Sequence, residues 1–355
     1  MKSDSRQKAD LMLLNFVTDL DDPLLGFTHD WIQAIEREVG SLVVISGRVG
    51  RHCLSKEIHL DSVHWVENQR IRNALKAIWT INRLVLKHRP KVIFTHMNYW
   101  FSVFALPASV WVRSKRVLWY AHYTGNSTLW LALKVNNLIL TSVPEAFPLI
   151  TPKLRSIGQA VNEQIFPLHQ RNFQNLNRFV HFGRLDQVKR IDHIIDCLTI
   201  FLASGHTSKI VFTQIGSPSN GEPPEFLSEV SKKCLTGSLE IHFLDSKQRI
   251  DLQGDLKSHE VFLHATLGSM DKAPLEAALS GLIVLSENQR IFRELGSHRF
   301  LGNDFDLVSQ LKALYSLTPI ERSQLQTIQR QNVLNRHSMS SLGKRFTQAV
   351  GPVDN

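Results

Sequence analysis

The sequence has only three cysteines in 355 residues and no long hydrophobic run. Cys53, Cys197 and Cys234 form no Cys-x-x-Cys pair, so neither a disulfide framework nor a zinc-binding spacing is predicted, and each is expected to be a small buried residue. No segment approaches the roughly 18 apolar residues that a membrane-spanning helix needs. The first ten residues are polar and lack the apolar core of a signal peptide. We therefore expect a cytoplasmic protein, at most peripheral at the inner face of the cytoplasmic membrane.

Acidic residues are fewer than basic ones: 32 Asp and Glu stand against 41 Lys and Arg, a formal net charge of +9. The excess is uneven, because residues 1–165 hold 20 basic and 13 acidic residues (+7) and residues 166–355 hold 21 and 19 (+2). All seven tryptophans lie before residue 131. A positive surface favours anionic partners such as nucleotide phosphates or an anionic membrane. The two halves are therefore expected to differ in surface and in role.

Short apolar runs alternate with helical patterns in both halves, which predicts βαβ units and parallel sheets. We predict two doubly wound domains, at 10–160 and 161–335, with 336–355 as a C-terminal helix that packs back on the first domain. The loop-rich segment Val143–Asn177 is expected to link them, with a ligand cleft between the domains. The predicted strands are Leu11–Val17, Ser41–Ser46, Val92–Thr95, Arg116–Tyr120, Phe179–Phe182, Lys209–Ile215, Leu239–Leu244, Val261–Ala265 and Leu282–Ser286. The predicted helices are Thr28–Val39, Asn68–His88, Arg190–Ala203, Pro224–Lys233, Pro274–Ser280 and Phe305–Leu317.

The clearest chemical signal follows the predicted strand Phe179–Phe182. The strand ends at Gly183, and Arg184 and Lys189 come next, at the start of a predicted helix. A helix N-terminus offers unpaired backbone N–H groups, and cations beside it add charge-assisted hydrogen bonds, so the segment favours an anion. Because arginine can grip phosphate oxygens with two N–H groups while lysine supplies a point charge, a diphosphate is predicted. A turn with two solvated cations is the structural alternative.

A second signal lies about eighty residues further on, after the predicted strand Val261–Ala265. A turn of small residues lets backbone N–H groups approach a ligand closely, and Pro274 suits the first turn of the helix that follows. Glu276 lies in that turn, where a carboxylate can stabilise the helix N-terminus or accept hydrogen bonds from a ribose diol. The residues expected to line this site are Gly268, Ser269, Met270, Asp271, Lys272 and Glu276.

In this order, the two segments resemble the GT-B glycosyltransferases of the large group 1 family, over roughly residues 155–300. In that family a Gly-Arg-x4-Lys segment holds the diphosphate of a nucleotide-sugar donor, and Gly183, Arg184 and Lys189 match it. The second glutamate of a Glu-x7-Glu element contacts the donor ribose, and Glu276 matches it. The resemblance implies an α/β GT-B fold of two Rossmann-like domains facing across a cleft. It also implies a retaining, hexosyltransferase-like enzyme that moves a sugar from a nucleoside-diphosphate sugar to a hydroxyl acceptor, in cell-surface glycan or glycolipid assembly.

The sequence departs from the family at the first glutamate of that element, where it has Gly268. The string Gly-Ser-x-Asp-Lys resembles a variant of the family, and we expect Asp271 to take over contact with the transferred sugar. Two alternatives stay open. One is a protein of the same fold that binds a nucleotide sugar without transferring it, and the other is a nucleotide-sugar epimerase.

The first half resembles the family less closely. The loop after the first strand holds Gly26 and His29, where the family places acceptor contacts, and His122 follows a strand end, as a family histidine near the donor sugar does. Asp19 and Asp21 form an Asp-x-Asp pair that could hold Mg²⁺. Its place after the first strand argues against that role, so neither a metal ion nor a cofactor is expected. The expected catalytic residues are Arg184, Lys189, Asp271 and His122.

The predicted helix Asn68–His88 carries a basic stripe. Its four cations lie within about 60° of one another at 100° per residue, and Trp79 shares the stripe. A solvated helix face is the simpler interpretation, and contact with anionic lipid is the alternative, which would suit a lipid-linked acceptor. Nucleic acid is not expected, because the aromatic residues form no recognisable stacking module. The residues of the stripe are Arg72, Lys76, Arg83 and Lys87.

Overall fold

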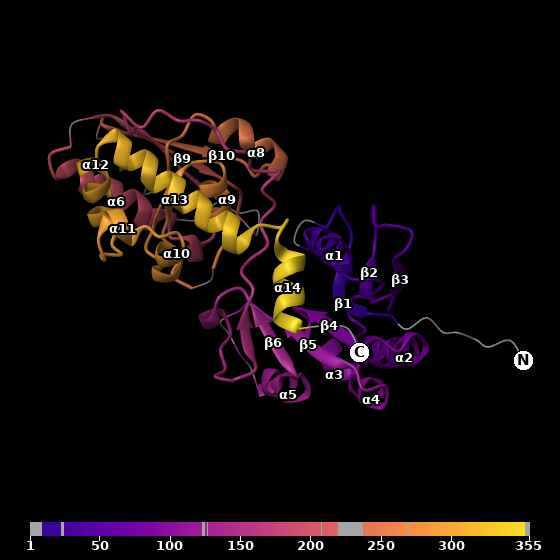
Figure 1. Cartoon of the computed structure of the whole chain (residues 1–355). Coiled ribbons are helices and arrows are strands. Elements are labelled where there is room, and N and C mark those ends of the chain that lie inside the picture. The colour runs from indigo at the N-terminus through magenta and orange to yellow at the C-terminus, as the bar shows by residue number, and fades with distance from the viewer. Residues whose placement is uncertain are drawn as a thin grey trace, which may run out of the picture. The chain divides into compact units, whose positions relative to one another are not determined.

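The computed structural model describes residues 9–22, 25–122, 125, 127–206, 208–218, 237–268 and 270–351. The chain divides into two compact units (Figure 1). The N-terminal unit comprises Met1–Ala160 and Met339–Asn355, and the C-terminal unit comprises Val161–Ser338. Each unit contains one parallel β-sheet. The predicted helix Pro224–Lys233, Ser269 and Cys234 lie outside the described residues.

The sheet of the N-terminal unit has seven parallel strands in the order β3-β2-β1-β4-β5-β6-β7. Its central strands consist largely of buried apolar residues, as expected of a parallel sheet covered on both faces. The strands are β1 (Leu11–Thr18), β2 (Leu42–Val49), β3 (His59–Ser62), β4 (Val92–His96), β5 (Lys115–Trp119), β6 (Leu138–Thr141) and β7 (Leu154–Ser156).

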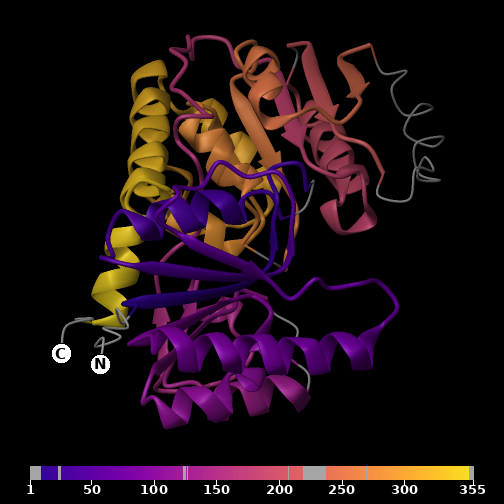
Figure 2. The same cartoon turned by 90° about the vertical axis from the view of Figure 1, so that its right-hand side faces the viewer.

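Alternate residues of β1 and β4 face two separate cores. On one face of the sheet lie α1 (Thr28–Glu36) and α14 (Leu342–Val350) (Figure 2). They pack over Leu13 and Phe94, and the rings of Phe346 and Phe94 are 4.7 Å apart. Gly343 is needed at this contact, because a Cβ there would lie 2.2 Å from the carbonyl oxygen of Ala34. The opposite face is covered by α2 (Arg70–His88), α3 (Tyr99–Phe104), α4 (Leu106–Trp111) and α5 (Ser127–Val135).

The sheet of the C-terminal unit has five parallel strands in the order β10-β9-β8-β11-β12. The strands are β8 (Arg178–Phe182), β9 (Ile210–Ile215), β10 (Leu239–Leu244), β11 (Val261–His264) and β12 (Ile283–Ser286). The described helices of eight or more residues are α6 (Ile191–Ala203), α8 (Arg249–Leu256), α12 (Leu307–Ser316) and α13 (Pro319–His337). The shorter ones are α9 (Ala273–Leu279), α10 (Gln289–Glu294) and α11 (His298–Leu301).

The order of the strands reverses direction once in each sheet, between β1 and β4 and between β8 and β11. In open parallel sheets, ligands bind outside the carboxyl ends of the strands at such a reversal. The two segments singled out in the second half follow β8 and β11, so they flank this position in the C-terminal unit. The GT-B expectation of two doubly wound sheets is confirmed at the level of topology.

The division between the two units falls inside the segment Val143–Asn177 that was expected to link them. The segment is more ordered than a loop-rich linker, because it contains β7 and because Phe173 and Leu176 belong to the core of the C-terminal unit. Its prolines and asparagines suggested a loop, and its scattered apolar residues are what tie it down. Among the described residues, no helix combines the length and the apolar composition needed to cross a membrane.

Candidate functional site

The turn after β8 contains Gly183, whose backbone packs closely against that of Gly216 after β9. Gly183 has a φ of +148°, a conformation that favours glycine, and its carbonyl accepts a 2.9 Å hydrogen bond from Nε2 of Gln214. At Gly216, after β9, a Cβ atom would lie 2.0 Å from that carbonyl oxygen. Glycine is therefore required at Gly216, and the sequence analysis missed it. The close approach leaves no room for a side chain at Gly216, and the backbone N–H groups of Gly183 and Leu185 donate to the carbonyls of Ile215 and Ser217.

Lys189 and Asp271 form an ion pair that joins the two segments. Both side chains are mostly buried, with 14% and 13% of their surface exposed. The Oδ2 atom of Asp271 also lies 3.4 Å from Nε2 of the fully buried His264. His264 in turn contacts Oγ of Ser286 through Nδ1 at 2.8 Å, so a neutral ring with its proton on Nε2 satisfies both neighbours. Lys189, predicted to bind the diphosphate, and Asp271, predicted to bind the transferred sugar, are thus brought together across the strand reversal.

The charge state of this cluster is set by competing effects. Burial alone would raise the pKa of Asp271, but the hydrogen bond from His264 and the charge of Lys189 outweigh burial and hold that pKa well below its usual value. Burial lowers the pKa of His264, against the opposing influence of Asp271. At neutral pH the cluster is therefore a carboxylate held between an ammonium group and a neutral imidazole.

Glu276 lies in the first turn of α9, after Pro274, and is 4% exposed. Its Oε1 atom is 3.4 Å from Nη1 of Arg249 on α8, yet no hydrogen bond from the described residues reaches it. Burial raises the pKa of this carboxyl, although Arg249 and Lys272 act in the opposite direction. A buried carboxylate oxygen that accepts no hydrogen bond from the described residues is costly to keep in the folded protein.

In the turn between β11 and α9, Gly268 occupies the position of the first glutamate of the family pattern, and a lack of space does not explain the glycine. A Cβ at Gly268 would meet no atom within 4 Å, so a larger side chain would fit there. Met270 is 4% exposed, which leaves mainly its backbone for a ligand. Arg184, by contrast, is a largely exposed side chain whose guanidinium lies 3.3 Å from a carboxylate oxygen of Asp186. The arginine can therefore swing toward a ligand without leaving a buried site.

The candidate residues of the N-terminal unit have different surroundings. Gly26 is packed among carbonyl groups, since a Cβ there would lie 2.8 Å from the oxygen of Asp22. His29 is buried, and its Nε2 accepts a 3.2 Å hydrogen bond from the backbone N–H of Cys53. Cys53 is exposed, so the expectation that it is buried was wrong, whereas Cys197 is buried. His122 follows β5 and is exposed.

The Asp-x-Asp pair has a structural role in the described loop. Asp19 accepts hydrogen bonds from the backbone N–H groups of Asp21 and Arg51, at 3.0 and 3.1 Å. The Nε atom of Arg51 donates to Asp21 at 2.8 Å, and this bond lowers the pKa of the Asp21 carboxyl. Both carboxylates thus hold the loops after β1 and β2 together.

The comparisons with known proteins show a shared fold. No protein-family model matches the chain, and no curated protein matches it in sequence. Among solved structures, Anabaena HepE in complex with UDP and glucose is similar with a TM-score of 0.66 at 12% identity, over 96% of this chain and 99% of that one. A glycosyltransferase from Rickettsia africae is similar with a TM-score of 0.65 at 12% identity, over 97% and 99%. WaaG, a glycosyltransferase involved in lipopolysaccharide biosynthesis, is similar with a TM-score of 0.59 at 14% identity, over 96% and 100%. The chain has the GT-B fold of these glycosyltransferases.

Proposed function

We propose that this protein is a glycosyltransferase that moves a sugar from a nucleoside-diphosphate sugar to a hydroxyl group. The observation that carries the proposal is the buried carboxylate oxygen of Glu276, which lies 3.4 Å from Arg249 and accepts no hydrogen bond from the described residues, on the segment that Asp271 ties to Lys189 at the strand reversal of the C-terminal unit. A nucleoside diphosphate offers ribose hydroxyls that donate to Glu276 and phosphate oxygens that accept from Lys189 and Arg184.

In this proposal each residue has one task. Negative charge develops on the departing diphosphate, and Arg184 and Lys189 stabilise it. Glu276 orients the ribose. Asp271 and Lys272 position the transferred sugar, and the bond that Asp271 makes to His264 fixes its orientation. His122 is proposed to lie near the donor sugar, and His29 and Gly26 to shape the acceptor side.

The finer features of the reaction are proposals of the same kind. Cationic residues already serve the diphosphate, and the Asp-x-Asp carboxylates are engaged with Arg51 and backbone groups, so transfer independent of a metal ion is proposed. Retention of the anomeric configuration follows from the family resemblance. HepE was solved with UDP and glucose, which makes UDP-sugars the first donors to test. The proposed acceptor is a sugar or a lipid-linked sugar of cell-surface glycan or glycolipid assembly.

The proposal is tested by screening UDP- and GDP-sugars for thermal stabilisation of the protein, and then by following sugar transfer from the stabilising donor to a panel of glycan and lipid-linked acceptors in EDTA. The expected result is selective stabilisation and a glycosylated product without added metal. Donor binding without a product across the panel would favour the non-catalytic alternative, which Gly268 motivates. Interconversion of the donor sugar without an acceptor would instead identify an epimerase.

We further propose that the N-terminal unit docks on an anionic lipid surface. The helices that cover one face of its sheet, α2 to α5, form one layer (Figure 2) and bear exposed tryptophans. Trp79 of α2 is 65% exposed and Trp111 of α4 is 79% exposed, and α4 packs beside α2. The guanidinium of Arg83 lies 4.9 Å from the ring centroid of Trp79. Interfacial tryptophans with flanking cations are typical of surfaces that lie in a bilayer interface. The other exposed apolar residues of α2 are Ile71, Leu75, Ile78 and Leu86.

If the N-terminal unit docks on anionic lipid, its binding to vesicles should depend on salt concentration. Vesicles with anionic lipid should sediment the protein at low salt and release it at high salt, and neutral vesicles should bind it weakly. The double variant Lys76→Glu and Lys87→Glu should lower the partition coefficient by at least about tenfold, since each basic residue contributes about 1 kcal/mol near such a surface. A matched variant of the other unit, Lys312→Glu, should bind like the unchanged protein. Binding that is equal on neutral and anionic vesicles would contradict this proposal.

A further inference from the structure

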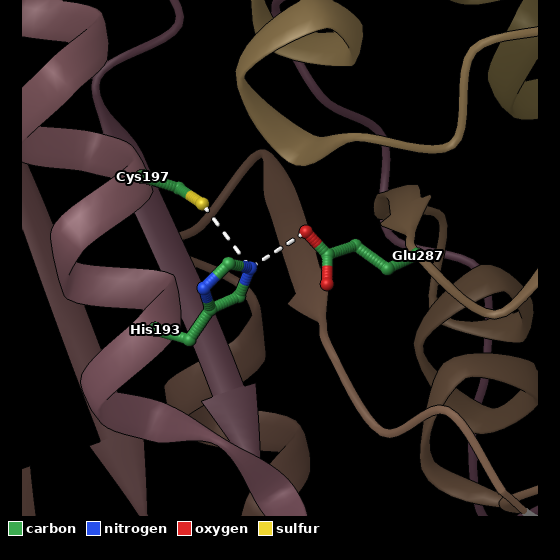
Figure 3. A group of neighbouring side chains, drawn as sticks. All are labelled: His193, Cys197 and Glu287. Atoms are coloured by element: carbon green, nitrogen blue, oxygen red, sulfur yellow. Dashed lines mark hydrogen bonds and ion pairs between the residues drawn. The ribbon is translucent and has the colours of Figure 1, made fainter.

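Three side chains of different chemistry lie together within the C-terminal unit, and none of them is assigned to the donor (Figure 3). His193 and Cys197 are one turn apart on the same side of α6, and Glu287 directly follows β12. The Nε2 atom of His193 lies 2.7 Å from Oε1 of Glu287 and 3.5 Å from Sγ of Cys197. The three potential ligand atoms all lie within 4.8 Å of one another. No other such group of three was found among the residues that the structure describes.

The separation of the sulfur and nitrogen atoms is close to that in a tetrahedral metal centre. With zinc at about 2.3 Å from sulfur and about 2.0 Å from nitrogen, the two ligand atoms are about 3.6 Å apart, which matches the observed 3.5 Å between Sγ and Nε2. The nitrogen and the carboxylate oxygen, now at 2.7 Å, would separate by less than about 1 Å to admit the ion. Cys197 is buried, while the side chain of His193 is 33% exposed, which leaves a path for the ion and for a water molecule as fourth ligand.

The surroundings support the three side chains as ligands. Nη1 of Arg190 donates to Oε2 of Glu287 at 2.8 Å and to the carbonyl of Ala265 at 3.1 Å, while Oε1 contacts the histidine and accepts a long 3.5 Å hydrogen bond from the backbone N–H of Leu307. Such partners orient a ligating carboxylate and tune its affinity for metal. Arg190 holds a left-handed backbone conformation with a φ of +52° to make these contacts.

We propose that His193, Cys197 and Glu287 form a zinc site that ties α6 to the end of β12. A mixed nitrogen, sulfur and oxygen set suits zinc among the abundant divalent ions, and coordination deprotonates the thiol. The three side chains of the centre are distinct from the proposed donor-binding residues. Its role is to stabilise the base of the turn that carries Lys189, so the zinc site and the metal-independent transfer reaction are separate properties.

The test uses the full chain, freed of metal with a chelator and titrated with Co²⁺ and then Zn²⁺. We expect one Co²⁺ per chain, with the intense visible bands of a tetrahedral ion and a thiolate-to-cobalt band, both displaced by Zn²⁺. Saturating Zn²⁺ should raise the Tm of the metal-free protein by on the order of 5 °C. Cys197→Ser should abolish the thiolate band and weaken Zn²⁺ binding at least about tenfold, and Cys53→Ser, which removes the exposed cysteine, should change neither.

His193→Ala gives a second test that does not alter the core, because this side chain is partly exposed. It should also weaken Zn²⁺ binding at least about tenfold while the metal-free variant keeps the Tm of the metal-free protein to within a few degrees. Absence of stoichiometric binding, or binding that survives both Cys197→Ser and His193→Ala, would overturn the proposal.

Discussion

Replacing Lys189 with alanine is expected to lower kcat/KM for sugar transfer by about 100- to 1000-fold, the effect of removing one preorganised donor to a developing anion. The lysine is held beside the strand reversal by Asp271, in a largely buried site where a charge acts more strongly than in water. Most of the loss should appear in kcat, because the diphosphate gains charge as the bond to the sugar breaks. Steady-state kinetics with the donor that binds best measures the change.

Two variants separate this role from a general loss of charge. Arg184→Ala should also lower the rate, though the exposed position of this arginine makes a smaller effect expected. Lys209 is an exposed residue that directly precedes β9 and pairs with Glu240. Lys209→Ala should leave the rate unchanged. A Lys189→Ala enzyme with folded structure and undiminished kcat/KM would show that the turn does not serve the diphosphate.

Replacing Glu276 with glutamine is expected to weaken donor affinity by about 10- to 100-fold, as loss of a charge-assisted hydrogen bond predicts. The same change should not destabilise the protein at neutral pH. Because burial raises the pKa of Glu276, the ionised carboxylate opposes folding, and the free energy of unfolding of the unchanged protein should fall as the pH rises from about 4 through that raised pKa. The glutamine variant lacks this decline. Denaturant unfolding across that pH range, with donor titrations at neutral pH, measures both effects.

Glu294→Gln is the matched control, because the pKa of Glu294 is lowered whereas that of Glu276 is raised. His337, whose Nε2 lies 3.5 Å from the Glu294 carboxylate, and Arg336, which donates to it at 2.9 Å, lower the pKa of Glu294. The carboxylate therefore stabilises the fold above its unfolded pKa of about 4 and loses that effect as the pH falls. This variant should lose stability at neutral pH and keep its donor affinity. A Glu276→Gln protein that is markedly less stable than the unchanged protein at neutral pH would mean that the carboxylate serves Arg249 rather than a ligand.

The sheets were predictable from sequence because parallel strands are buried on both faces and appear as short apolar runs. The predicted strand Leu239–Leu244 matches β10 residue for residue, and β1 differs from its prediction only by Thr18. Helix α13 was missed, since its 19 residues carry few apolar positions. Its start was nevertheless encoded, because Thr318 and Glu321 form a reciprocal capping box of the Thr-x-x-Glu type.

The candidate site was predictable in its motifs but not in its supporting residues. Gly183, Lys189 and Glu276 were found because glycine and charge at strand-to-helix junctions have a local sequence pattern. His264 and Gly216 act through partners 7 and 33 residues away in the chain, Asp271 and Gly183, so no local pattern identifies them. Tertiary contacts of this kind are also what bring Arg249 to Glu276 and Glu287 to His193.

The central claim is that a nucleoside diphosphate binds the C-terminal unit between the turn after β8 and the start of α9. Hydrogen–deuterium exchange with and without saturating UDP tests it most directly, because the method locates protection along the chain. The account predicts slower exchange in peptides that cover residues 183–190 and 268–277, and loss of that protection in Glu276→Gln at the same UDP concentration. Protection confined to other parts of the chain, or unchanged in the variant, would contradict it.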